Sequence, residues 1–150
     1  MYMASSDLKS LFFGIIAAVI ATIVWSYSVI LTNFQFGLIS AAVGFIVGIG
    51  VSMGQKNPKP SLIVLSIVLT LLSLAVSQFL IVRHIVNQNS LSFMQIPLIV
   101  DPSIFLDVVV RSIQIEPITL LFWGISLYLA YAVVAGIGKK DEAKENLAKK

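Results

Sequence analysis

Four long apolar stretches without an interior charge limit what this chain can fold into. They cover residues 11–32, 37–53, 62–82 and 118–137. An α-helix rises about 1.5 Å per residue, so roughly 20 residues cross a hydrocarbon core about 30 Å thick. Three stretches reach that length, and Phe34 and Phe36 extend the shorter second one into the interface. The sequence therefore predicts an all-α fold, a four-helix transmembrane bundle.

Composition supports a membrane location. Hydrophobic residues make up 58% of the 150 residues and charged residues 11%, whereas soluble domains carry about 25% charged residues. One bundle uses residues 1–138 and leaves residues 139–150 as a charged cytoplasmic tail, which we expect to be helical. The first stretch exceeds the roughly 7–15 apolar residues of a signal peptide and lacks a clean small-x-small cleavage site, so we expect it to be retained.

The distribution of basic residues predicts the orientation. Four crossings put both termini and residues 54–61 on one side of the membrane. That side carries eight of the ten basic residues: Lys9, Lys56, Lys59, Lys139, Lys140, Lys144, Lys149 and Lys150. The opposite side carries Arg83 and Arg111. Because lysine and arginine near span ends accumulate on the cytoplasmic side, both termini are predicted to be cytoplasmic. The excess of basic residues is thus a topology signal and predicts no nucleic-acid partner.

Prolines and glycines mark the predicted helix ends. Pro60 forbids continuation of the second span, and Ser61 is predicted to cap the third. Pro117 suits the first turn of the fourth span, and Gly136 with Gly138 is predicted to close it.

Small residues at a spacing of four predict how the first two spans pack. One row is Gly14, Ala18, Thr22 and Ser26, and the other is Ser40, Gly44, Gly48 and Ser52. Small residues allow helix backbones in a membrane to approach closely. Because a short turn joins the two spans, we expect the rows to face each other. Homodimerisation through the same face is the alternative.

Polar side chains on the third span have two interpretations. The hydroxyl residues at helical spacing are Ser66, Thr70, Ser73 and Ser77. Such hydroxyls bond back to the carbonyl four residues earlier or across to a neighbouring helix. The alternative is that they line a polar pore. Trp123 and Tyr128 of the fourth span are candidates to point into the bundle.

The linker at residues 85–116 is predicted to hold an amphipathic helix. Asp101 and Pro102 form a good helix start, and the helix ends before Pro117. Its polar stripe is Ser103, Asp107, Arg111 and Gln114, with Asp107 pairing with Arg111. The helix is predicted either to cap the bundle as a lid or to dock another subunit. Its candidate docking residues are Phe105, Val108 and Val109.

The chain has few residues of the types that bind metals or act in catalysis. His84 is the single histidine and the chain has no cysteine, so neither bis-histidine haem ligation nor a thiolate metal site is predicted. No phosphate-binding loop, dinucleotide fingerprint, G-x-S-x-G or H-E-x-x-H motif occurs. We therefore predict no catalytic residues, no metal site and no cofactor, and a protein that is not an enzyme.

Residues 37–54, GLISAAVGFIVGIGVSMG, carry one resemblance. The segment resembles the second span of small bacterial multi-span membrane proteins without an assigned function, in which a short hairpin leads into a G-F-x-V-G-x-G-V sequence. Those proteins often have a basic residue after the glycine-valine pair, where this chain has Ser52. The resemblance covers the first two spans and implies architecture and a bacterial inner-membrane location, but no site residues.

Two functions are compatible with these features. The first is a small non-enzymatic accessory or structural subunit that contacts membrane lipids and packs against other membrane subunits or itself. The second is a small pore-forming or transport component, including a holin-like one. The small-residue rows and the apolar outer linker favour the first.

The charge distribution generates a topology prediction. Cysteines introduced at Lys56 and Lys144 should be shielded from an impermeant thiol reagent in intact cells, and a cysteine at Ser90 should react. The native chain has no cysteine to interfere. Labelling of Lys56→Cys without labelling of Ser90→Cys would reverse the orientation.

Overall fold

The computed structural model of the chain describes residues 5–32, 37–54, 59–89, 101–115 and 117–148, and all regular structure in these ranges is helical. The helices are α1 (Ser5–Thr32), α2 (Gly37–Met53), α3 (Pro60–Asn89), α4 (Pro102–Ile115) and α5 (Ile118–Ala148). The prediction of an all-α chain is confirmed for this part of the sequence.

The predicted bounds of α2 and α4, the end of α1 at Thr32 and the start of α5 at Ile118 are confirmed, and α3 departs from its predicted bounds. The main-chain N–H of Phe105 donates to the Asp101 carbonyl at 3.0 Å, which closes the first turn of α4. The third helix begins at Pro60 and not after a Ser61 cap, because proline is compatible with a first helical turn. It continues to Asn89, beyond the predicted end at residue 82.

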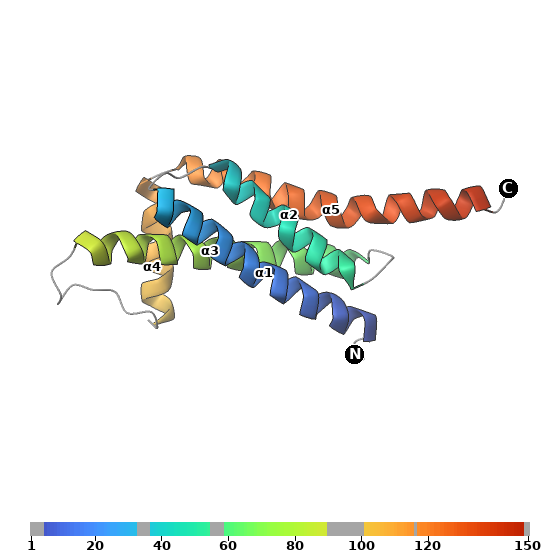
Figure 1. Cartoon of the computed structure of the whole chain (residues 1–150), viewed down its shortest axis with the longest axis horizontal. Helices are drawn as coiled ribbons and strands as arrows, with labels where there is room; N and C mark the ends of the chain where they lie inside the picture. The colour runs from blue at the N-terminus through green and yellow to red at the C-terminus, as the bar shows by residue number, and fades with distance from the viewer. Residues whose placement is uncertain (1–4, 33–36, 55–58, 90–100, 116, 149–150) are drawn as a thin grey trace.

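The fourth apolar span ends at Gly136, close to its predicted end, but the prediction that Gly136 and Gly138 close the helix is wrong, because α5 continues without a break to Ala148. A glycine ends a helix when it adopts the left-handed conformation, and otherwise costs only about 1 kcal/mol relative to alanine. The following residues 139–148 are mostly lysine, glutamate, alanine and leucine, which are strong helix formers. The charged tail is therefore an extension of the apolar helix and projects past the other helices (Figure 1).

The four longer helices lie side by side with alternating direction (Figure 1). Helix α2 packs against α1, α3 and α5, and α3 also packs against α1 and α5. The start of α1, the end of α2, the start of α3 and the end of α5 lie at one end of the molecule (Figure 1). Helix α4 crosses the opposite end and contacts α3 and α5.

A row of valines on α2 forms the centre of the core. Val43, Val47 and Val51 are spaced four residues apart, so they share one face of the helix, and all three are fully buried. The same cluster contains Ala21, Trp25, Val29, Leu62, Leu74, Ile81 and Val134 from α1, α3 and α5. This valine face directs α2 into the interior, and the glycines on either side of it meet two different neighbours.

The prediction that the small-residue rows of α1 and α2 face each other is wrong. A Cβ atom at Gly44 would collide with the carbonyl oxygen of Ser126 in α5, and one at Gly48 would lie 3.0 Å from Cβ of Val133. The row therefore faces α5. Gly50 and Gly54 meet α1 instead: an added Cβ at Gly50 would lie 2.8 Å from the Phe13 carbonyl oxygen, and one at Gly54 would collide with the Ser10 backbone. The pair Gly44 and Gly48 and the pair Gly50 and Gly54 thus lie on different sides of α2. The sequence alone does not say which neighbouring helix each pair meets.

Apolar side chains cover much of the outer surface. Among the described residues, three helices are long and apolar enough to cross a membrane: Asp7–Thr32, Pro60–Gln88 and Ile118–Gly136. Large exposed side chains on them include Phe12, Val19, Ile23, Val64, Leu72, Leu121 and Tyr131. Helix α2, apolar over Ile39–Met53, is shorter. Three of the four predicted spans thus have the required length and composition, and the second stays a prediction.

The close approach at Gly44 generates a stability prediction. Gly44→Ala should destabilise the protein by about 1–3 kcal/mol, because the added methyl group must displace the α5 backbone. Gly124→Ala is the matched control, since nothing lies within 4 Å of its Cβ position. It should be neutral or stabilising by up to about 1 kcal/mol. Unfolding in mixed detergent micelles measures both, and equal effects would contradict the α2–α5 contact.

Candidate functional site

The buried hydroxyl groups of α3 connect it to two neighbouring helices. Ser73 Oγ donates to the Ala18 carbonyl at 3.2 Å and Ser77 Oγ donates to the Thr22 carbonyl at 3.4 Å, both in α1. Ser66 Oγ donates to the carbonyl of Ala130 in α5 at 3.4 Å. These bonds confirm the prediction of hydroxyls that bond across to neighbouring helices. They also set the register of α3 against α1 and α5.

Other hydroxyls donate to a carbonyl four residues earlier in their own helix. Thr70 Oγ1 donates to the Ser66 carbonyl at 2.8 Å, and Ser52 Oγ donates to the Gly48 carbonyl at 2.7 Å. An unpaired polar group in an apolar environment costs several kcal/mol, so these bonds allow serine and threonine inside an apolar bundle. The hydroxyl hydrogens of the α3 row point to main-chain carbonyls.

Four buried polar atoms have no hydrogen-bond partner within the described part of the chain. They are Ser10 Oγ, Ser26 Oγ, Gln78 Oε1 and Trp123 Nε1. The indole of Trp123 packs against the core, as predicted. Tyr128 is 67% exposed, so the prediction that it points into the bundle is wrong. Ser26 continues the small-residue row of Gly14, Ala18 and Thr22, whereas no pattern in the sequence indicated Ser10.

The predicted packing residues of α1 lie against α3 and α2. A Cβ at Gly14 would lie 2.8 Å from side-chain atoms of both Leu69 and Val51. Ala18 and Thr22 provide the carbonyls that accept from α3. On α2, Ser40 is buried, and the Gly44 N–H donates to Ser126 Oγ at 2.9 Å.

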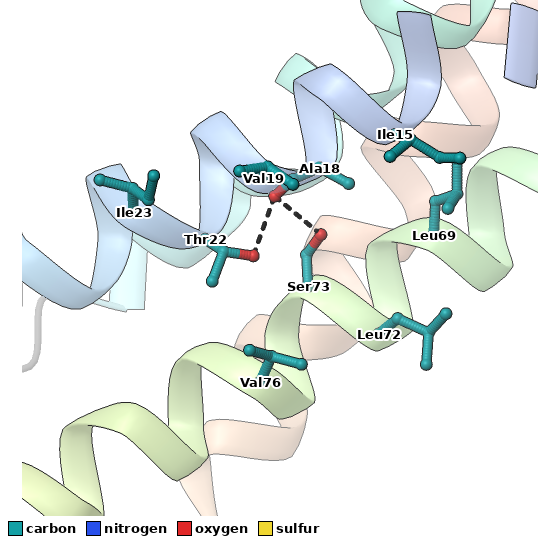
Figure 2. Close-up of a pocket in the computed structure, with 9 residues that line it drawn as sticks. All are labelled: Ile15, Ala18, Val19, Thr22, Ile23, Leu69, Leu72, Ser73 and Val76. Carbon is teal, nitrogen blue, oxygen red and sulfur yellow. Dashed lines mark hydrogen bonds between the residues drawn. The ribbon is translucent and has the colours of Figure 1, made fainter. Parts of the chain in front are cut away.

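A groove runs between α1 and α3 and has a volume of about 320 Å³ (Figure 2). It is lined by Ile15, Ala18, Val19, Thr22, Ile23, Leu69, Leu72, Ser73 and Val76. At its floor the Ala18 carbonyl accepts from Thr22 Oγ1 at 2.8 Å and from Ser73 Oγ at 3.2 Å (Figure 2). Because both hydroxyls donate to this one oxygen, the groove presents mainly hydrocarbon.

A second hollow lies along the first turns of α1. It has a volume of about 700 Å³ and is lined by Leu8, Lys9, Leu11, Phe12, Phe13 and Ile15. Near it, Asp7 Oδ1 lies 3.3 Å from Nζ of Lys59 at the start of α3. The hollow and the groove share Ile15.

The face of α4 that carries Phe105, Val109 and Ser112 is turned toward the rest of the protein. The Phe105 ring lies 5.3 Å from the Phe79 ring of α3, between centroids. Val109 and Ser112 are buried and Val108 is half-buried. The prediction of Val109 as a docking residue is wrong, because the chain itself covers it. Phe105 and Val108 are half-buried, and their docking role stays a prediction.

The polar stripe of α4 is exposed. All four of its residues, Ser103, Asp107, Arg111 and Gln114, are exposed. Arg111 Nε lies 2.8 Å from Asp107 Oδ2. This hydrogen bond, with the attraction between the charges, raises the pKa of Arg111 above its usual value. The two flanks between stripe and buried face are apolar and exposed: Ile104 and Ile115 on one, Leu106 and Val110 on the other.

Metal-ligating side chains do not gather in the described ranges, where no three His, Cys, Asp or Glu residues could hold one ion. His84 is half-buried near the end of α3.

Comparisons with known proteins add no relative: no protein-family model, curated protein or solved structure matches the chain. The resemblance of residues 37–54 to small bacterial membrane proteins stays a prediction.

The opposite environments of two adjacent valines generate a prediction for α4. Val109 is 6% exposed and Val110 is 50% exposed. Val109→Glu should destabilise the detergent-solubilised protein by about 2 kcal/mol or more, because it places a polar group in an apolar contact. Val110→Glu should leave the melting temperature nearly unchanged. Equal melting temperatures for the two variants would mean that α4 does not pack on α3.

Proposed function

We propose that the chain is a non-enzymatic integral membrane protein that acts as a small accessory or structural subunit of a larger membrane complex. The observation that carries the proposal is the inverted distribution of polarity. Buried Ser66, Thr70, Ser77 and Gln78 lie inside the helix set, while large apolar side chains cover the outer surface of α1, α3 and α5. A protein surrounded by lipid requires this arrangement, because hydrocarbon cannot satisfy polar groups.

In this proposal α1, α2, α3 and α5 form a four-helix transmembrane bundle, and α4 lies at the outer interface. The 17 residues of α2 are short for a crossing, and aromatic Phe34 and Phe36 would place its start in the headgroup region. Most basic residues belong to the end that holds the starts of α1 and α3 and the end of α5. The positive-inside tendency puts this end in the cytoplasm of a bacterium, with the bundle in the inner membrane.

The subunit role rests on α4. One face of this helix is occupied by its own protein through Phe105 and Val109, and the opposite stripe is polar. The flank of Leu106 and Val110 is apolar and exposed at 59% and 50%. The glycine rows of α2 are already used within the chain. A partner subunit is therefore expected to dock on this flank of α4 and not on the small-residue rows.

A pore-forming or transport component, including a holin-like one, is the second candidate. The observation that favours it is the set of unpaired buried polar atoms, Ser26 Oγ, Gln78 Oε1 and Trp123 Nε1. Such atoms within a membrane often mark a path for water or a solute.

Extraction in mild detergent followed by native mass spectrometry tests the subunit proposal. The chain should be recovered with other membrane proteins at a fixed ratio. Val110→Glu should reduce the recovered complex at least fivefold while the free chain keeps its melting temperature. Recovery of the chain alone, together with dye leakage from liposomes that contain only this chain, would contradict the subunit role and support the pore.

A further inference from the structure

The groove between α1 and α3 and the hollow at the start of α1 form one continuous apolar surface. They share Ile15. Leu8, Phe12, Ile15 and Val19 follow one another at spacings of three and four residues, so they lie on one face of α1. All four are exposed. The surface therefore extends along α1 from Leu8 to Ile23, with α3 as its second wall beyond Ile15.

The length of this surface matches one leaflet of a bilayer. From Lys9 to Ile23 the helix rises about 21 Å at 1.5 Å per residue. Half of a hydrocarbon core is about 15 Å, and the remainder reaches the headgroup level. A ligand that occupied the surface would thus have one end at the cytoplasmic headgroups and the other near the middle of the bilayer.

A cation lies at the headgroup end. Lys9 is exposed and lines the hollow. The nearby carboxylate of Asp7 is paired with Lys59 at 3.3 Å, and among the ion pairs of the described residues none involves Lys9. The mouth of the surface therefore carries a positive charge next to hydrocarbon walls, which complements a ligand with an anionic head and an apolar tail.

We infer that this surface binds an anionic phospholipid of the cytoplasmic leaflet, with the headgroup at Lys9 and one acyl chain in the groove between α1 and α3. The inference rests on the membrane insertion proposed above. The groove floor suits an acyl chain, because the hydroxyls of Thr22 and Ser73 both donate to the Ala18 carbonyl (Figure 2). A bound chain would cover exposed Val19 and Leu72 and bridge the two helices.

The headgroup contact is tested with purified protein titrated with dioleoyl phosphatidylglycerol or dioleoyl phosphatidylcholine and measured by native mass spectrometry. Phosphatidylglycerol should bind more tightly. Lys9→Gln should weaken its binding about fivefold, the effect of one lysine near an anionic lipid, and leave phosphatidylcholine unchanged. Arg111→Gln removes the same charge at the opposite end and should change neither. Equal effects of the two substitutions would overturn the headgroup assignment.

The acyl-chain contact is tested with two neighbouring residues of α1. Val19 lines the groove and Ile20 does not, yet their exposures are similar, at 53% and 49%. Val19→Trp should fill the groove and weaken binding of both phospholipids, and Ile20→Trp should weaken neither. Indistinguishable binding by the two tryptophan variants would overturn the acyl-chain assignment. Should membrane insertion itself be wrong, the unaltered chain would fail to float with liposomes, an outcome that separates the two failures.

Discussion

The close approach of α2 to α5 at Gly44 is the contact on which the arrangement of the other helices depends. Lipid tails are as apolar as leucine, so helices in a membrane gain little from hydrophobic burial and associate through close packing and hydrogen bonds. Gly44 allows both, because its missing side chain admits the α5 backbone and its N–H donates to Ser126 Oγ at 2.9 Å. On another side of α2, Gly50 admits α1. Helix α2 is thereby held between two neighbours, and its valine face forms the core with α3.

The serine hydroxyls of α3 bond this helix to α1 and α5. Ser66 reaches α5, and Ser73 and Ser77 reach α1, each through a main-chain carbonyl that is already part of a helix. Carbonyl oxygens have two lone pairs, so those of Ala130 and Thr22 accept a second bond without loss of the helical one. Serine supplies these links with little volume, and the apolar surface outside stays uninterrupted. In the groove between α1 and α3, the hydroxyls of Thr22 and Ser73 are both bonded to the Ala18 carbonyl.

The two ends of the molecule differ in what they offer to their surroundings. At one end α4 covers α3 through Phe105 and Val109 and leaves the flank of Leu106 and Val110 open. At the other end Lys9 and the ion pair of Asp7 with Lys59 border the apolar surface of α1. In the functions proposed here, protein partners dock at the first end and lipid headgroups are held at the second.

The sequence by itself determined the helices, most of their boundaries and the exposed polar stripe of α4, because each depends on the residue pattern within a few turns of one helix. Which carbonyl Ser66 or Ser73 meets depends on the helix that packs beside α3. Tertiary structure decided the rest. Whether Gly44 meets α1 or α5 depends on which helix approaches it, and the chain is free to place either there. Which apolar residues of α4 are covered depends on the rotation of that helix against Phe79. The continuation of α5 through Gly136 depends on main-chain conformation, which glycine leaves open.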